Sequence, residues 1–140
     1  MVRTITNIFG TAVFALGTLI ACHASAQGES PLGVWINDTG LGAVEITQCG
    51  KGVCGRVVWV KSPSKKKVCG LQVIGDAADV GGGVYDKGWI YDPKNGMKFD
   101  VELTPQGSTL QVMGYMDGDK TLSKTMIWTA APSDLQRCKA

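Results

Sequence analysis

The sequence predicts an all-β protein, a small antiparallel up-and-down barrel of about eight strands. Apolar residues recur at every second position, most clearly between Met97 and Leu103 ("MKFDVEL"), where they alternate with charged residues. Clusters of Gly, Pro, Asn and Asp, which favour turns, separate such stretches. No stretch after residue 26 is typical of an amphipathic helix. Short, half-buried strands joined mainly by tight turns are therefore expected.

The expected strands follow one another along the chain. They lie at about 32–37, around Val44–Ile46, and at about 53–61, 69–75, 84–92, 97–103, 109–116 and 122–130. The turns contain residues 38–40, 50–52, 93–96, 105–107 and 117–119. Gly81–Gly83 lacks the ending and the following helix of a phosphate-binding loop, so it is interpreted as a flexible connection back to the sheet. Because an open sheet leaves exposed edges, we expect these strands to close into a barrel.

The first 26 residues predict a signal peptide. Arg3 precedes an apolar run from Ile8 to Ala21, and Ala24-Ser25-Ala26 fits the rule for cleavage before Gln27. Residues 27–140 would then form a single barrel domain without a membrane span, exported to the periplasm or secreted. Two alternatives stay open. Leu19–Cys22 resembles a lipoprotein processing site, which would lipidate Cys22 and tether the protein to the outer membrane, and the apolar run could instead stay uncleaved as an anchor.

Export removes the chemistry that depends on histidine. His23 is the only histidine and would leave with the signal peptide, so a catalytic triad, a Cys-His pair and a His-ligated zinc site are not expected. A hydrolase would have to use carboxylates, of which the stock is Asp86, Asp92, Asp100, Glu102, Asp117 and Asp119. Turn formation or solvent exposure explains most of these residues, and Asp117 with Asp119 are too few for a calcium shell. We expect no catalytic residue, no metal and no cofactor.

Four cysteines remain after residue 26, and an even number in an oxidising compartment predicts two disulfides. Cys49 and Cys54 flank a turn. If they face each other across a hairpin, Ile46 lies opposite Val57 and the apolar residues share one face, which favours a Cys49–Cys54 bond. The remaining bond would then tie the tail to the barrel. The pairings considered are Cys49–Cys54 with Cys69–Cys138, Cys49–Cys69 with Cys54–Cys138, and Cys49–Cys138 with Cys54–Cys69.

The nearly balanced charge argues against a nucleic-acid partner. The chain has 14 Lys and Arg against 12 Asp and Glu, and loss of Arg3 would leave 13 against 12. The extended basic field of a nucleic-acid binder is missing from this composition. The one local excess, Lys65–Lys67, is interpreted as a solvated loop, with contact to anionic headgroups or glycolipid phosphates as the alternative.

A barrel of this size is either filled by its own side chains or holds one small ligand. Trp59, Met97 and Phe99, with Trp89 and Tyr91, are expected on the inner face. The candidates for lining a ligand are Trp59, Trp89, Tyr91, Phe99 and Tyr115. The same residues would equally suit a solid core.

Several motifs occur together in a fixed order: Gly33–Trp35, Cys54–Trp59, Ile90–Gly96, Leu110–Tyr115 and Trp128–Thr129. They resemble the landmarks of domain of unknown function 2147, a family of small exported bacterial proteins, over about residues 31–130. The resemblance implies a small β-barrel-like domain of the cell envelope with no established activity. Segment 62–83 and the tail past Trp128 depart from the pattern.

Gly33 and Trp35 also resemble the Gly-x-Trp motif in the first strand of the lipocalin-like (calycin) superfamily. That resemblance implies a lipocalin-like barrel in which Trp35 plugs one end and an arginine stacks on its ring. Arg137, just after the last expected strand, is the candidate for that arginine.

Three functions follow from these observations. The first is a non-catalytic barrel that binds a small apolar molecule or lipid. The second is a structural or protein-interaction module of the bacterial envelope with a solid core, whose partner is an envelope component. The third is a carboxylate-dependent hydrolase. The sequence does not indicate an oligomeric state.

Overall fold

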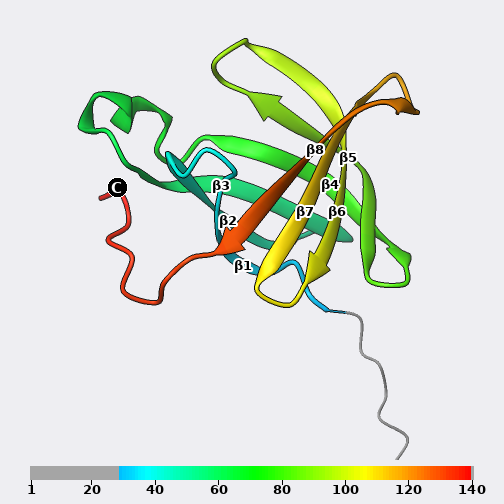
Figure 1. The fold of residues 1–140 in the computed structure, drawn as a ribbon, viewed down its shortest axis with the longest axis horizontal. Helices are drawn as coiled ribbons and strands as arrows, with labels where there is room; N and C mark the ends of the chain where they lie inside the picture. The colour runs from blue at the N-terminus through cyan, green and yellow to red at the C-terminus, as the bar shows by residue number, and fades with distance from the viewer. Residues whose placement is uncertain (1–28, 140) are drawn as a thin grey trace, which may run out of the picture.

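The computed structural model describes residues 29–139, which form a closed antiparallel barrel (Figure 1). Its strands are β1 (Gly33–Ile36), β2 (Gly42–Cys49), β3 (Gly52–Val60), β4 (Gln72–Gly81), β5 (Val84–Asp92), β6 (Met97–Gln106), β7 (Thr109–Met116) and β8 (Asp119–Ala130), and a 3-10 helix, η1 (Pro63–Val68), joins β3 to β4. Each strand pairs with the next along the chain, and β1 pairs with β8 to close the barrel. The predicted all-β barrel is confirmed. Within the described part, no helix has the length and apolar character needed to cross a bilayer.

The up-and-down order divides the connections between the two ends of the barrel. The η1 end carries the β1–β2, β3–β4, β5–β6 and β7–β8 connections, and the opposite end carries the others. The described chain also begins at the opposite end, where the carboxylate of Glu29 accepts a hydrogen bond from the Gly107 backbone N–H at 2.5 Å. Figure 1 accordingly shows the chain entering at the lower right and η1 at the upper left.

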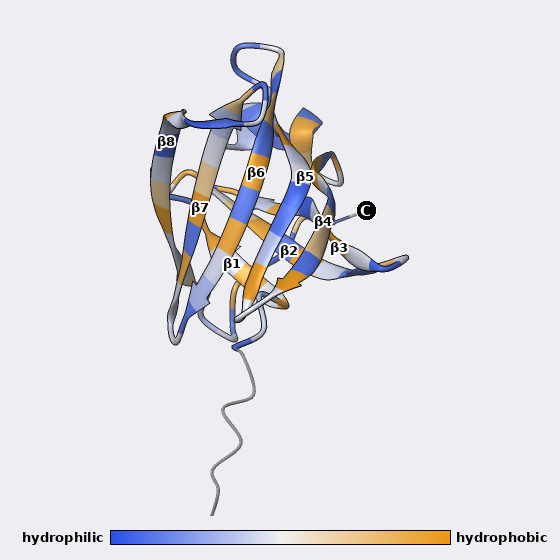
Figure 2. Ribbon diagram, turned by 90° about the vertical axis from the view of Figure 1, so that its right-hand side faces the viewer, coloured by the Kyte–Doolittle hydropathy of each residue, from blue (hydrophilic) through white to orange (hydrophobic). Residues whose placement is uncertain are grey.

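The barrel interior is packed with apolar side chains. On β6, Val101 and Leu103 are fully buried, whereas Asp100 and Glu102, which alternate with them, point to the outside. Figure 2 shows the same alternation as blue and orange bands along the strands. The buried cluster consists of Trp35, Val44, Ile46, Val53, Val57, Val73, Ile74, Ala77, Ile90, Val101, Leu103, Leu110, Val112 and Trp128.

Two segments differ from the sequence expectation. Strand β4 runs from Gln72 to Gly81, well past the expected end at about residue 75, so of the expected connection only Gly82 and Gly83 form the turn into β5. Both glycines have positive φ, which favours glycine in so tight a turn. The Lys65–Lys67 segment lies in the last turn of the 3-10 helix η1, and Val68 and Leu71 anchor this connection by packing against the core.

The β2–β3 hairpin has a tighter register than expected. Cys49 lies opposite Gly52, and Ile46 lies opposite Gly55 instead of Val57. The expected register is therefore wrong by two positions, because Gly50, with φ +56°, and Lys51 alone make the turn. A slip of two positions keeps every side chain on its face, since strand side chains alternate with a period of two.

Candidate functional sites inside and outside the barrel

Buried apolar side chains occupy the barrel interior formed by residues 29–139. The two best-formed depressions among the described residues both lie on the outside of the barrel. One lies under the C-terminal tail beside Val34, and the other lies next to the Cys49–Cys54 hairpin. Interior positions such as Ile74, Leu103 and Leu110 are completely shielded from solvent. The interior is a close-packed core along most of the barrel.

The structure does not gather the five aromatic candidates inside. Phe99 packs against the core, and Ile90, opposite it on β5, is one of the buried residues. Trp89 and Tyr91 flank Ile90 and therefore point outward, contrary to the expectation. Their strand is apolar on both faces, so alternation alone did not show which face turns inward.

Three further candidates also lie away from the core. Tyr115 alternates with the inward-facing residues of β7 and belongs to the outer face, although only 5% of it is exposed. Trp59 lies opposite Ala43, next to an irregularity in the β2–β3 pairing, and is not among the residues packed against the core. Met97, also expected inside, is 46% exposed at the β5–β6 turn.

One polar atom inside the barrel lacks a partner. The indole Nε1–H of Trp128 is buried and donates no hydrogen bond within the described residues. The ring itself is 4% exposed and belongs to the core cluster. A buried N–H without an acceptor is unfavourable by roughly 1–3 kcal/mol. Among the buried side-chain polar atoms of residues 29–139, this N–H is the one that an added ligand acceptor would satisfy.

The outer face carries a polar cluster that sequence reasoning did not assemble. The Tyr115 hydroxyl donates to Asp86 Oδ1 at 2.6 Å, and Lys120 Nζ lies 2.6 Å from Asp86 Oδ2. Lys120 also pairs with Glu102 on β6. Asp86 is 7% exposed and sits at an irregularity of β5, where Lys87 has φ +63° and donates its backbone N–H to Asp86 Oδ1 at 2.7 Å. The cluster brings together side chains from four strands, β5 to β8, so no local sequence motif indicates it.

The cluster holds its members in their usual charge states. Burial raises the pKa of Asp86, but the hydrogen bonds from Lys120, Tyr115 and Lys87 outweigh it, so its pKa lies below 3.8. Burial and then the Asp86 carboxylate raise the pKa of Tyr115 to about 12. The carboxylates raise the pKa of Lys120. At neutral pH Tyr115 is therefore neutral, whereas Asp86 and Lys120 are charged, and their contacts fasten the β7–β8 hairpin to β5.

A second outer feature is Trp89, whose ring packs against a glycine. A Cβ added to Gly75 would approach the Trp89 ring to 2.3 Å, so only glycine fits beneath it. The Lys98 ammonium lies 4.0 Å from the ring centroid, a distance suited to a cation–π contact.

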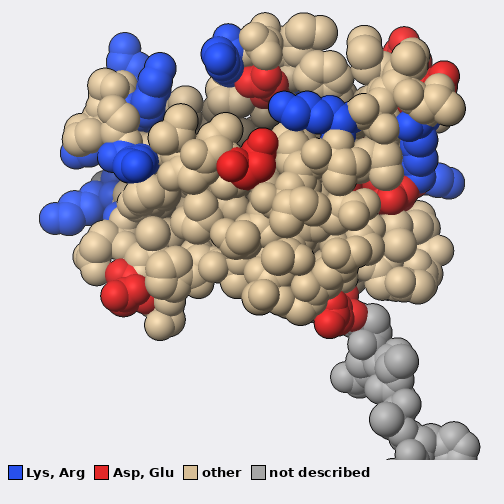
Figure 3. Space-filling view, in the orientation of Figure 1, with Lys and Arg blue, Asp and Glu red and all other residues tan. Residues whose placement is uncertain are grey.

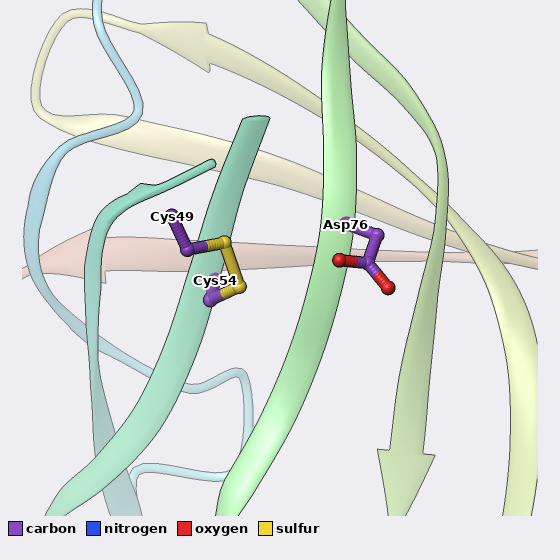
Figure 4. A group of neighbouring side chains, drawn as sticks. All are labelled: Cys49, Cys54 and Asp76. Carbon is purple, nitrogen blue, oxygen red and sulfur yellow. A yellow bond between two sulfur atoms is a disulfide. The ribbon is translucent and has the colours of Figure 1, made fainter. Parts of the chain in front are cut away.

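The structure contains the disulfides Cys49–Cys54 and Cys69–Cys138. The first crosses the hairpin diagonally, because Cys54 lies opposite Thr47 and not opposite Cys49. Asp76 of β4 lies beside it on the same outer face (Figure 4), and the carboxylate and sulfur atoms all lie within 4.8 Å of one another. Metals bind thiolates, and sulfurs joined in a disulfide are not thiolates, so this group does not form a metal site in the oxidised protein.

Trp35 and Arg137 do not meet as expected. Trp35 is buried inside, and its indole N–H donates to the Pro31 carbonyl at 2.8 Å. Arg137 lies outside, where it forms an ion pair with Glu45 at 2.8 Å. The neighbouring Cys138 is bonded to Cys69 and donates its backbone N–H to Val58, which keeps this part of the tail on the outer face of the barrel. The expectation that Arg137 stacks on Trp35 is therefore wrong.

The tail forms a strap over three strands. The Ala131 backbone N–H bonds to Val34 on β1, Arg137 reaches Glu45 on β2, and Cys138 reaches Val58 on β3. Figure 1 shows this red segment running outside the barrel from the end of β8 to the η1 loop. The predicted signal peptide, including Cys22 and His23, lies outside the described residues.

Comparisons with known proteins agree with this architecture. No curated protein matches the chain. Among solved structures, protein HP1028 from Helicobacter pylori, described as belonging to the lipocalin family, is similar with a TM-score of 0.62 and 16% sequence identity. The match covers 74% of this chain and 84% of the H. pylori chain, and at that identity it shows a shared fold alone. The family described as "Uncharacterized protein conserved in bacteria (DUF2147)" matches residues 33–130, from the start of β1 to the end of β8. The chain belongs to the DUF2147 family, and its fold is an eight-stranded lipocalin-like barrel.

Proposed function

We propose that this protein is a non-catalytic, exported barrel that acts through its outer surface, as a structural or interaction module of the bacterial envelope. The observation that carries the proposal is the filled interior: core side chains occupy the barrel, and the best-formed depressions lie outside it. Of the three functions considered from the sequence, this is the second.

Export is supported by the cysteines and by the start of the chain. The described residues contain two disulfides, and such bonds persist in oxidising compartments but are rare in the cytosol. The apolar run from Ile8 to Ala21, followed by a small-x-small site, would deliver residues 27–140 to the periplasm or medium. Processing at Cys22 would instead deliver an outer-membrane lipoprotein.

A non-catalytic role is supported by the state of the buried carboxylate. A general acid or base needs a pKa near the working pH, whereas the pKa of Asp86 is lowered and both of its oxygens already accept hydrogen bonds. The cluster thus suits a structural ion pair better than the third hypothesis, a hydrolase.

The experiment compares uptake of an apolar probe by the wild type and by a variant with an opened core. Leu103 is fully buried, so Leu103→Ala should leave a dry apolar cavity of the kind that binds benzene. We expect benzene to bind Leu103→Ala, seen as ligand-shifted NMR signals, and not to bind the wild type. Leu110→Ala provides a second core variant if the first is too unstable to fold.

Native mass spectrometry of the wild-type protein completes the test. A co-purifying apolar ligand bound one to one, or saturable benzene binding by the wild type, would overturn the solid-core proposal. Absence of both, together with binding by a core variant, would support it.

The second candidate is the binding barrel, and one observation favours it: the unpartnered indole N–H of Trp128. A small ligand with a polar acceptor would satisfy that group if the barrel opened to admit it. Under this alternative, a ligand that co-purifies with the wild type should be lost from Trp128→Phe while the fold is retained.

A further inference from the structure

Basic and acidic residues are unevenly distributed along the chain, although its net charge is small. From Ile46 to Gly75 it contains six Lys or Arg and no Asp or Glu, a formal charge of +6. The rest of the chain contains eight basic and twelve acidic residues, a formal charge of −4. The near-neutral composition therefore conceals a strongly basic segment.

The fold concentrates most of that segment at the η1 end. The side chains of Lys61, Lys65, Lys66 and Lys67 are all exposed on the β3–β4 connection, and we call these four residues the basic loop. Arg56 reaches the base of the loop, where its guanidinium donates to the Gly70 carbonyl at 3.1 Å. Figure 3 shows blue side chains gathered at the left, where Figure 1 places η1.

The basic loop is not neutralised by the protein itself. The ion pairs among the described residues involve Lys120 and Arg137, and none involves a lysine of the basic loop. The first turn of η1 contains no acidic residue, and its last turn is Lys65–Lys67. Four cations held on one short connection repel one another, a cost that an anionic partner would relieve.

The loop is also held firmly in place. Three backbone hydrogen bonds fix it. The N–H groups of Lys65, Cys69 and Gly70 donate to the carbonyl oxygens of Ser62, Lys66 and Val57, at 3.0, 3.0 and 2.7 Å respectively. Val68 packs against the core, and the Cys69–Cys138 disulfide joins the end of the loop to the strap. The lysine backbones are therefore ordered before any partner arrives, which lowers the entropic cost of binding.

The shape and composition of the loop indicate the kind of partner. None of the four lysines lines either of the two depressions, and all four are exposed, an arrangement that suits a broad anionic surface better than a discrete small anion. No aromatic residue lies between Val60 and Leu71, so it lacks the stacking platform of a single-strand nucleic-acid binder. Its charges are lysines, which act as point charges towards phosphate, and clusters of four to eight basic residues are typical of anionic lipid binding.

We propose that the basic loop docks this protein onto the anionic headgroups of a lipid bilayer. The inference rests on the proposed action through the outer surface and names its partner. The contact is electrostatic and peripheral, because the nearest apolar loop residue, Val68, faces the core. The described chain begins at the opposite end of the barrel, so a docked η1 end leaves that start directed away from the bilayer.

The test is co-sedimentation of the oxidised protein with vesicles of phosphatidylcholine alone or mixed with phosphatidylglycerol. We expect binding to the mixed vesicles only, and loss of that binding at about 1 M salt, where the Debye length is about 3 Å. One lysine near an anionic surface changes the affinity about fivefold, so the triple variant Lys65→Gln, Lys66→Gln, Lys67→Gln should bind on the order of a hundredfold more weakly.

The matched control removes the same charge elsewhere. The triple variant Lys51→Gln, Lys87→Gln, Lys124→Gln neutralises three exposed lysines outside the basic loop, none of them in a connection at the η1 end, and should keep most of the binding. All six positions are exposed, and circular dichroism checks that both variants fold.

Three results would overturn the proposal: no binding to the mixed vesicles at low salt, equal weakening by the two triple variants, or displacement by inorganic phosphate at a concentration too low to screen charge. The third would show a discrete phosphate site instead of a surface. None of these results depends on benzene uptake, so this inference and the solid-core proposal can fail separately.

Discussion

The two disulfides close loops of very different length, and this predicts unequal losses of stability. Cys49–Cys54 spans 5 residues of sequence, and Cys69–Cys138 spans 69. The perturbation is a pair of double variants, Cys49→Ala with Cys54→Ala and Cys69→Ala with Cys138→Ala. Each removes two cysteines and one bond, so each serves as the control for the other.

The expected magnitudes come from the chain entropy that each bond removes from the unfolded state. The short loop should contribute about 2 kcal/mol and the long loop about 4 kcal/mol to the free energy of unfolding. Loss of the Cys69–Cys138 bond also weakens the attachment of the strap. The end of the tail is then held by the Arg137–Glu45 ion pair and by the backbone hydrogen bond to the Val58 carbonyl. The difference between the variants should therefore be at least about 2 kcal/mol.

Equilibrium urea unfolding followed by tryptophan fluorescence measures both values. With a urea slope of about 1–3 kcal/mol per molar, the midpoint of the Cys69→Ala, Cys138→Ala variant should lie roughly 1–2 M below that of the other variant. Equal midpoints, or a larger loss for the short loop, would refute the loop-entropy reasoning and indicate that local strain or residual structure in the unfolded chain governs these bonds.

Three further predictions concern glycine packing and the outer cluster. Gly88→Ala should destabilise by about 3 kcal/mol in thermal unfolding, because its Cβ would lie 2.4 Å from the Gly75 carbonyl oxygen; Gly114→Ala, whose nearest neighbour would be 3.7 Å away, should be near neutral, and equal effects would contradict the packing argument. In an ultraviolet phenolate titration, Tyr115 should ionise with a pKa of about 12, and Tyr115→Phe should remove that transition. Because the pKa of Tyr115 is raised above 10.0, its contribution to stability is present below pH 10 and is lost as the pH rises towards 12. Asp86→Asn should lower the free energy of unfolding in urea at neutral pH by about 2 kcal/mol. Because the pKa of Asp86 is lowered, its contribution to stability is present above about pH 4 and is lost as the pH falls, so the variant should lose that acid-sensitive part. Asp134→Asn, at an exposed position of the tail, is the control, and equal acid sensitivity of the two variants would contradict this role.

The strand pattern of β6 could be interpreted from the sequence, whereas that of β5 could not. On β6 the charged residues Asp100 and Glu102 mark the outer face, so Val101 and Leu103 are assigned inward correctly. On β5 apolar or aromatic residues occupy both faces around Ile90. Trp89 then turns outward because Gly75 leaves room for its ring on the outside, a fact about a neighbouring strand.

The outer cluster shows the same limit for a candidate site. Asp86, Glu102 and Tyr115 are polar or amphipathic residues on three different strands, and Lys120 is on a fourth. Their association depends on pairings between strands and on the irregularity at Asp86 and Lys87, neither of which has a local signature. The even number of cysteines after residue 26, in contrast, can be counted directly, and it predicts two disulfides without any knowledge of the strand pairing.

By itself the sequence determined the all-β class, the closed meander and the local excess of positive charge at Lys65–Lys67, because a period of two, turn residues and charge are local properties. Tertiary structure alone decided the two-residue turn at Gly50 and Lys51, the filled interior and the outward path of the tail to Cys138. The physical reason is that alternation makes neighbours point in opposite directions but does not select the inner face or the register. Those choices are made by side chains from different strands competing for the same volume.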